Sequence, residues 1–122
     1  MTPEQLEEGA KALTEARRIG TLLEGLDGLT PPDMAAGYAL QNAFMRRWDD
    51  ALVGWKVGAT AEKVQQVYGV SEPFSGPFYA ATTLASPARP AAGGFRHHCI
   101  ESEFAFRFGR DLPPRDTPYS RD

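Results

Sequence analysis

The sequence of 122 residues predicts an α+β fold in which helices come first and strands follow. Apolar side chains recur every three or four residues over much of the first 50 positions, which is typical of amphipathic helices. After position 50, runs rich in valine, tyrosine and phenylalanine end at stretches rich in glycine and proline. Such runs are typical of strands and the loops that connect them.

Composition limits the class of protein. Hydrophobic residues make up 42% and charged residues 24%, which is ordinary for a soluble globular protein. The net charge is −3 and the basic residues are scattered, so no nucleic-acid partner is expected. The sequence has neither an apolar run of about 18 residues nor a secretory signal, so no membrane partner is expected. The single cysteine, Cys99, excludes an internal disulfide and favours a cytoplasmic location.

The first helix is predicted to begin after Thr2 and to end near Gly20. Thr2 can cap the helix, Pro3 suits its first position, and Gln5 completes a capping box. Gly20 is the residue type that most often ends a helix.

A second helix is predicted over residues 33–48. The stretch Thr-Pro-Pro-Asp at 30–33 is a helix-start signal. Residues that share one face of this helix follow at helical spacing: Tyr38, Gln41, Phe44, Met45 and Trp48.

Three shorter elements are predicted next. Residues 51–58 favour a strand that ends at a glycine, and Thr60 can cap a short helix that Gly69 would close. Residues 70–77 are rich in serine, proline and glycine and are expected to form a loop. A short strand is then predicted at 78–82.

A long strand is predicted at 95–108, with a break near His97 and His98 left open. Its residues alternate between two faces, one of them formed by Ile100, Ser102, Phe104, Phe106 and Phe108. We expect the phenylalanine face to pack into the core, and so much aromatic surface needs partners to cover it. The ending resembles a loop that enters another helix, so we expect the chain to be the front part of a larger protein.

Two carboxylates, Glu101 and Glu103, lie on the opposite face of this strand. Side chains at i and i+2 are about 7 Å apart along a strand, so both could contact one hard cation such as Mg²⁺. Most such ions also need a third protein ligand or several waters. The alternative is a solvated polar face, which spacing alone favours.

Lys56 lies in the stretch GWKVG, between two glycines that allow a close approach. A lysine among apolar neighbours could be a desolvated catalytic residue. The alternative is a lysine on an edge strand that faces water, and the sequence alone favours it.

Three other kinds of motif give weaker indications of a functional site. His97, His98 and Cys99 look like a metal cluster, yet adjacent strand residues point to opposite faces, which favours a polar strand entrance and a buried thiol. The glycine-rich stretches lack the spacing of nucleotide-binding loops. Ser75 and Ser120 lack the context of a hydrolase nucleophile.

Four stretches in order, GYALQ, GWKVGAT, GVSEPFSGPFY and IESEFAFRFGRDLP, resemble the 2-keto-4-pentenoate hydratase family. This family belongs to the fumarylacetoacetate hydrolase-like superfamily and includes 4-oxalocrotonate decarboxylases. The resemblance runs from about residue 22 to residue 122. It implies a helical segment at 1–50, followed at 51–122 by the first strands of a mixed β-roll that is incomplete here.

The resemblance also implies roles for individual residues. Glu101 and Glu103 match the two family carboxylates that bind Mg²⁺ or Mn²⁺, and a third acidic ligand would lie beyond Asp122. Lys56 matches the active-site lysine, which would polarise or protonate the substrate if its pKa is lowered. The cation would stabilise the enolate of a 2-keto acid, so no organic cofactor is expected.

The implied activity is that of a lyase, a hydratase or decarboxylase of a small 2-keto acid such as 2-hydroxypenta-2,4-dienoate in aromatic catabolism. Many hydratases have acids in a loop resembling GVDEPDFG, where this chain has Ser71 and Phe74, so both reactions stay open. The resemblance implies a homo-oligomer or pairing with a related subunit. We also expect that a front fragment could be inactive alone. The alternative function is a non-catalytic, subunit-like assembly protein that retains the front half.

Overall fold

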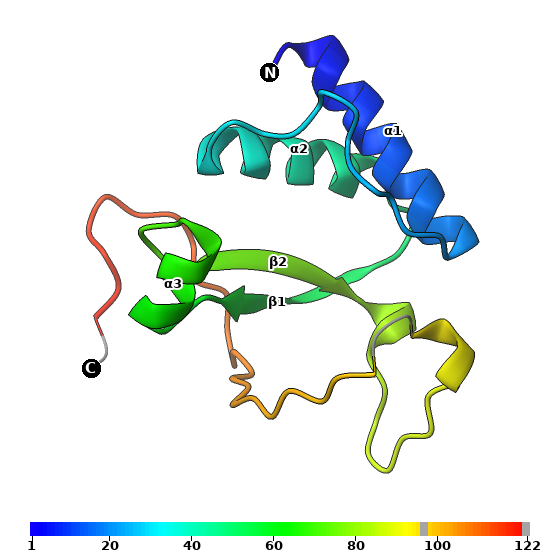
Figure 1. Ribbon diagram of the computed structural model, residues 1–122. Coiled ribbons are helices and arrows are strands. Elements are labelled where there is room, and N and C mark those ends of the chain that lie inside the picture. The colour runs from blue at the N-terminus through cyan, green and yellow to red at the C-terminus, as the bar shows by residue number, and fades with distance from the viewer. Residues whose placement is uncertain (96–97, 121–122) are drawn as a thin grey trace.

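The computed structural model describes residues 1–95 and 98–120 and is a small α+β structure, which confirms the predicted class. Two helices lie on one side of a two-stranded antiparallel sheet, and a short third helix connects the strands (Figure 1). The elements in chain order are α1 (Pro3–Ile19), α2 (Met34–Arg47), β1 (Leu52–Gly58), α3 (Glu62–Tyr68) and β2 (Phe74–Tyr79). Short 3₁₀ turns follow at Ala80–Thr82 and Ala92–Gly94.

Helix α1 begins and ends at the predicted residues. The Gln5 backbone N–H donates to Thr2 Oγ1 at 3.2 Å, and the Thr2 N–H donates to Gln5 Oε1 at 2.8 Å. These two bonds satisfy backbone donors that a helix start leaves without partners. Gly20 ends the helix with a left-handed φ of 68°, and its N–H donates to the Ala16 carbonyl.

Helix α2 begins after Asp33, whose Oδ1 accepts the Ala36 N–H at 2.8 Å. It ends at Arg47, because Trp48 adopts an extended backbone conformation with a φ of −86° and a ψ of 115°. The Trp48 ring stacks on Phe44 with centroids 5.5 Å apart. The predicted helix at 33–48 is therefore confirmed.

The core lies where α1 and α2 meet each other and the sheet. Ala10 and Ala43 are fully buried, and their small side chains allow the two helices to approach closely. Leu40, Phe44 and Tyr79 fill the remaining space, and Tyr79 attaches β2 to the helices. Burying each of the larger side chains contributes about 1.5–3 kcal/mol to the stability of the fold.

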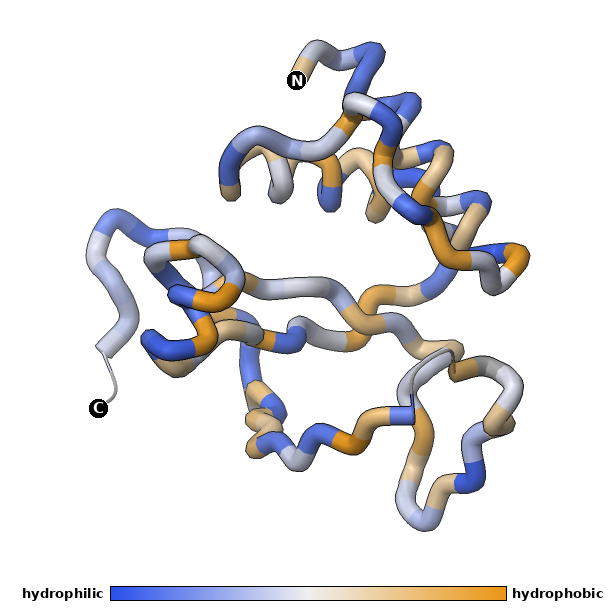
Figure 2. The backbone as a smooth tube through the Cα atoms, in the orientation of Figure 1, coloured by the Kyte–Doolittle hydropathy of each residue, from blue (hydrophilic) through white to orange (hydrophobic). Residues whose placement is uncertain are grey.

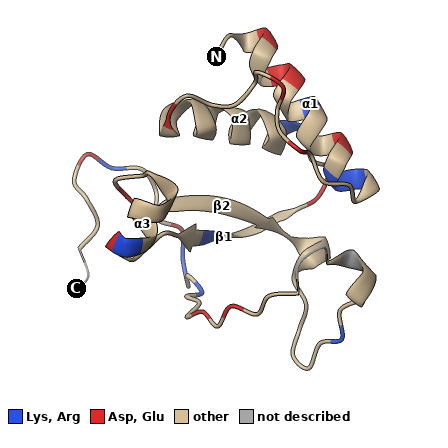
Figure 3. Cartoon of the chain, in the orientation of Figure 1, with Lys and Arg blue, Asp and Glu red and all other residues tan. Residues whose placement is uncertain are grey.

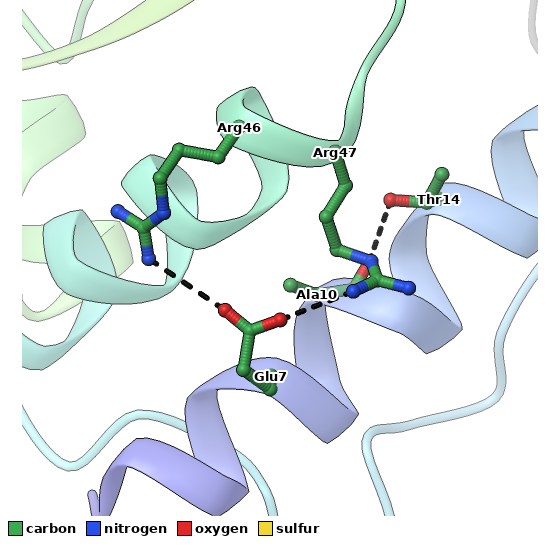
Figure 4. A network of polar contacts seen from close by, with 5 residues as sticks. All are labelled: Glu7, Ala10, Thr14, Arg46 and Arg47. Atoms are coloured by element: carbon green, nitrogen blue, oxygen red, sulfur yellow. Dashed lines mark hydrogen bonds and ion pairs between the residues drawn. The ribbon is translucent and has the colours of Figure 1, made fainter.

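A polar network lies at the edge of the contact between α1 and α2 (Figure 4). Glu7 of α1 forms ion pairs with Arg47 at 3.1 Å and with Arg46 at 3.7 Å. The buried Thr14 hydroxyl donates to the Ala10 carbonyl at 2.7 Å, so this polar group has a hydrogen-bond partner. The ion pairs are partly exposed, so each contributes only about 0.2–1 kcal/mol and mainly sets how the helices are aligned.

The second strand begins earlier than predicted. The expected strand at 78–82 is wrong, because the structure has β2 at 74–79 followed by a 3₁₀ turn at 80–82. The Ala81 N–H donates to Asp50 Oδ2 at 3.1 Å. The preceding Ala80 N–H still donates to the Ala51 carbonyl at 2.9 Å, so the chain leaves the ladder at Ala81, whose amide bonds to a side chain. The expected loop at 70–77 is therefore confined to 70–73.

Helix α3 begins two residues after its predicted cap. The structure places Ala61 rather than Thr60 at the N-cap, and no side chain caps the helix there. A positive φ of 53° at Ala59 turns the chain where β1 ends, and helical bonds begin only at the Ala61 carbonyl. Gly69 ends the helix with a φ of 66°, as predicted.

The predicted strand at 95–108 is wrong within the described part of the chain, because residues 98–108 form no strand. Ile100 and Phe104 are 94% and 98% exposed, so the expectation that the phenylalanine face packs into the core is also wrong. Figure 2 shows both hydrophobic and hydrophilic positions along this segment, which runs on the opposite side of the sheet from α1 and α2. A strand needs a ladder partner, whereas β1 and β2 pair with each other and none of the described residues pairs with this segment.

Two further expectations concern this region. Cys99 is exposed, so the predicted buried thiol is wrong. His97 lies outside the described residues, and so does the predicted break next to it. No helix in the described ranges 1–95 and 98–120 is long and apolar enough to cross a membrane.

Candidate functional site

The register of the sheet places Lys56 between two phenylalanines. Lys56 of β1 pairs with Gly76 of β2. Gly54 pairs with Phe78, and Gly58 pairs with Phe74. Because directly opposed residues of antiparallel strands share a face, the lysine projects from the same face as both aromatic side chains.

The two glycines of β1 are needed because the phenylalanine rings lie over them. A Cβ atom at Gly54 would come within 2.3 Å of the Phe78 ring, and one at Gly58 within 3.0 Å of the Phe74 ring. The ring of Tyr68 in α3 meets Phe74 edge-on, with centroids 5.9 Å apart. Apolar rings therefore border the lysine position on both sides.

Lys56 contacts both of the carboxylates that the sequence singles out. Figure 3 shows where the acidic and basic positions lie along the chain. The Lys56 Nζ lies 3.1 Å from Glu101 Oε2 and also donates a hydrogen bond to Glu103 Oε1. Lys56 and Glu103 are 47 positions apart in the sequence, and the fold brings them together. The three side chains are 50% to 63% exposed, so the cluster is open to solvent.

These contacts determine the charge state of the lysine. The hydrogen bond to Glu103, followed by the one to Glu101, raises the pKa of Lys56. A role in substrate protonation was expected to require a lowered pKa, and the described arrangement shifts the pKa in the opposite direction. With both carboxylates beside it, Lys56 is an ammonium that can donate hydrogen bonds but cannot accept a proton.

A separate cavity of about 400 Å³ lies between α1, α2 and β2. Leu13, Leu40 and Phe44 line it, together with Arg17. It contains none of the three predicted site residues and no carboxylate. Its polar side chains, Arg17 and Gln41, include no group that transfers a proton at neutral pH, so we place the candidate site at Lys56 instead.

Curated proteins show the same likeness that the motifs predict. A 2-keto-4-pentenoate hydratase of Paraburkholderia xenovorans is 33% identical over 117 residues, covering 92% of this chain and 43% of that protein. The chain is similar in sequence to the 2-keto-4-pentenoate hydratases. A second hydratase, from Dechloromonas aromatica, is 33% identical over 124 residues, covering 98% of this chain and 46% of its own length.

A third relative, the TodF product hydratase of Pseudomonas putida, is 33% identical over 109 residues, covering 86% of this chain and 41% of that protein. The predicted resemblance to this family is therefore confirmed. The chain spans less than half the length of these curated hydratases. No family model matches it, and no solved structure matches it.

The resemblance to the hydratases implies Mg²⁺ or Mn²⁺, and the geometry at Lys56 allows the fit to be tested. Oxygens of Glu101 and Glu103 already converge on one cation, the Lys56 ammonium. Carboxylate oxygens are the ligands that hard divalent ions prefer. Among the described residues, no group of three or more His, Cys, Asp and Glu side chains lies together. The described residues therefore offer two suitable ligands for the ion. Its remaining ligands would have to come from water, substrate or other protein groups.

Sequence reasoning missed the phenylalanines that border the lysine. Phe74 was interpreted only as standing where an acid is expected, and Phe78 only as part of a strand. A usable signal was present, because Gly-x-Lys-x-Gly at 54–58 is complementary to Phe-x-Gly-x-Phe at 74–78. Ser75, considered as a nucleophile, has its backbone N–H bonded to the Tyr38 hydroxyl at 3.0 Å.

Proposed function

We propose that this chain provides the metal-binding carboxylates and the lysine of a divalent-metal-dependent lyase. The substrate would be a small 2-keto acid such as 2-hydroxypenta-2,4-dienoate in aromatic catabolism, with hydration as the reaction and decarboxylation as the alternative. The convergence of Glu101 and Glu103 on the Lys56 ammonium carries the proposal. The similarity to proteins that are named 2-keto-4-pentenoate hydratases supports it.

Each residue has a defined task in this proposal. Glu101 and Glu103 hold Mg²⁺ or Mn²⁺, which when bound stabilises negative charge on the carboxylate and keto oxygens of the substrate. Lys56, whose pKa the carboxylates raise, stays an ammonium and donates a hydrogen bond to the substrate oxygen. The rings of Phe74 and Phe78 exclude water and pack against the carbon chain of the substrate.

The proposal extends to the fold and the assembly. Strands β1 and β2, together with residues 98–108, would be the first strands of a mixed β-roll like that of the fumarylacetoacetate hydrolase-like superfamily. The helical segment 1–50 and the roll portion 51–122 would form its two parts. The working protein would be a cytoplasmic homo-oligomer or would pair with a related subunit. The described chain alone would have little or no catalytic activity, because it supplies only part of the ligand set.

Metal-dependent stabilisation tests the proposal. The thermal unfolding midpoint is measured with and without MnCl₂ for the chain and for a Glu101→Gln/Glu103→Gln double variant. A ligand at about 100 times its Kd stabilises the folded state by about 2.7 kcal/mol, so we expect a rise in the midpoint that saturates with Mn²⁺. The double variant should lose this rise. A Glu24→Gln/Glu72→Gln variant removes the same charge elsewhere and should keep it.

The same experiment separates the proposal from non-specific ion effects. An equal rise in all three proteins would show that Mn²⁺ acts on general charge. The absence of any rise in the unaltered chain would show that the two carboxylates do not bind the ion, and the enzyme proposal would be rejected.

The second candidate function is a non-catalytic assembly protein, and the exposed apolar row favours it. Residues 100–108 present Ile100, Phe104, Phe106 and Phe108 to solvent. Exposed patches of this kind often mark protein–protein contacts. Light scattering after gel filtration tests this function: a defined oligomer that a Phe104→Ser/Phe106→Ser variant loses would support it, and a monomer in both proteins would reject it.

A further inference from the structure

The Lys56 ammonium lies where a divalent cation would bind. Its Nζ is 3.1 Å from Glu101 Oε2 and donates to Glu103 Oε1. Divalent ions bind carboxylate oxygens at about 2.0–2.6 Å. An ion that uses the same two oxygens would lie at most about 6 Å from Nζ, and in most arrangements much closer. Two positive charges at this separation repel each other, so they cannot share the carboxylates without weakening each other's contacts.

We propose that the Lys56 ammonium and the divalent cation compete for Glu101 and Glu103, and that Lys56 tethers residues 98–108 to β1 until the ion displaces it. This inference rests on the proposed function, because it requires the two carboxylates to bind the ion. Lys56 acts here as a competitor of the ion for the two carboxylates and not as a support of the metal site. Metal binding would release its ammonium from the carboxylates and leave it available to other groups.

The tether follows from how the segment is attached. Residues 98–108 form no ladder with the sheet. In the described part of the chain, the polar contacts that join this segment to the sheet are those of Lys56 with Glu101 and Glu103. The loss of one ammonium group would therefore remove the polar attachment of the whole segment.

Exchange of the two cations is also physically accessible. The Lys56 side chain is 50% exposed, and both carboxylates are more exposed than the lysine. Ion pairs that are open to solvent are worth little, so a divalent ion that gains two carboxylate ligands can displace the ammonium.

The sign of the effect distinguishes competition from simple support of the site. If Lys56 only held the carboxylates in place, its removal would weaken metal binding. If it competes, its removal strengthens metal binding. Mn²⁺ affinity is therefore measured from the electron paramagnetic resonance signal of free Mn²⁺ in the chain, Lys56→Met, Lys56→Arg and a control, Lys63→Met, from the exposed part of α3.

We expect Lys56→Met to bind Mn²⁺ roughly threefold to tenfold more tightly than the unaltered chain, from the loss of two exposed ion pairs. Lys56→Arg retains the charge and should bind within about twofold of the unaltered chain, as should Lys63→Met. Without metal, chymotrypsin should cleave after Phe104 and Phe106 faster in Lys56→Met than in Lys63→Met, because the tether is lost.

The outcomes separate this inference from the proposed function. Binding in the unaltered chain that is equal or weaker in Lys56→Met overturns the competition and leaves the proposed function intact. No Mn²⁺ binding in either protein overturns the proposed function and the competition with it. Equal cleavage in Lys56→Met and Lys63→Met overturns the tether. Circular dichroism of every variant confirms that folded proteins are compared.

Discussion

Replacing Tyr79 with phenylalanine should stabilise this protein, although removing a buried hydroxyl usually destabilises one. Tyr79 is 2% exposed, and its ring lies 6.1 Å from that of Trp48. The Arg17 guanidinium lies over the Tyr79 ring, 5.4 Å from its centroid. The Tyr79 hydroxyl is buried and has no hydrogen-bond partner among the described residues. The ring therefore contributes packing, while the hydroxyl contributes a desolvation cost.

The size of the effect follows from these two terms. A buried polar group without a partner costs about 1–3 kcal/mol. The oxygen also makes a few van der Waals contacts, each worth about 0.1–0.2 kcal/mol, which Tyr79→Phe loses. We therefore expect a net stabilisation of about 0.5–2 kcal/mol. For a chain of this length, 1 kcal/mol corresponds to a rise of about 4 °C in the unfolding midpoint.

Urea unfolding, monitored by circular dichroism, measures this free energy directly. Tyr68→Phe is the matched control, because Tyr68 is largely exposed and its hydroxyl can bond to water. The control should change the free energy of unfolding by less than about 0.5 kcal/mol. A loss of 1 kcal/mol or more in Tyr79→Phe would show that the hydroxyl is hydrogen-bonded in solution, and the reasoning would be refuted.

Two further predictions concern the caps and pH. Thr2→Ala removes the acceptor of the Gln5 N–H and should lower the free energy of unfolding by about 1 kcal/mol, which urea unfolding would show; an unchanged value would mean that the first turn of α1 frays in solution. Burial raises the pKa of Tyr79 above 10.0, and the hydrogen bond to Glu103 raises that of Lys56 above 10.5. The folded state therefore holds both protons more tightly than the unfolded state, so stability should fall as pH rises above about 10, and a constant unfolding midpoint from pH 9 to 11 would contradict this.

The parts of the fold that depend on local interactions could be predicted from the sequence. The capping box at Thr2, the cap at Asp33 and the helix ends at Gly20 and Gly69 involve residues within five positions of each other. The side chains of Thr2 and Asp33 bond to backbone groups three positions away, and Gly20 and Gly69 adopt the left-handed conformation that ends a helix. These predictions agree with the structure for that reason.

The position of β2 could not be predicted from local patterns. Its first residues, Phe74 to Pro77, include serine, glycine and proline and look like a loop. They form a strand because Gly54 and Gly58 of β1 leave room for the phenylalanine rings, so the pairing decides the structure. The residues that decide this pairing lie in two segments about 20 positions apart. A short stretch of sequence taken by itself therefore does not reveal the strand.

The candidate site also depends on contacts between residues that are far apart in the sequence. Neither Lys56 nor the pair Glu101 and Glu103 was distinctive alone, and the sequence favoured a solvent-facing role for each. The order of motifs pointed to a shared site, and the fold brings the three side chains into contact. Their role in metal binding stays a prediction until Mn²⁺ binding is measured.

The segment at 100–108 shows how a correct pattern can lead to a wrong element. In an extended chain its three phenylalanines would lie on one face and its two carboxylates on the other, so the segment suits an apolar layer on one side and a polar site on the other. The described chain supplies only the polar side, through Lys56, while Phe104 and Phe106 face solvent. A strand forms only where a neighbouring strand accepts its hydrogen bonds, and none of the described residues pairs with this segment, although β1 and β2 each keep one unpaired edge. If a partner paired a strand with this segment and also covered the phenylalanines, the same residues would gain a ladder and a buried face together. The two carboxylates would then be held on a rigid strand beside the lysine, as a catalytic metal site requires.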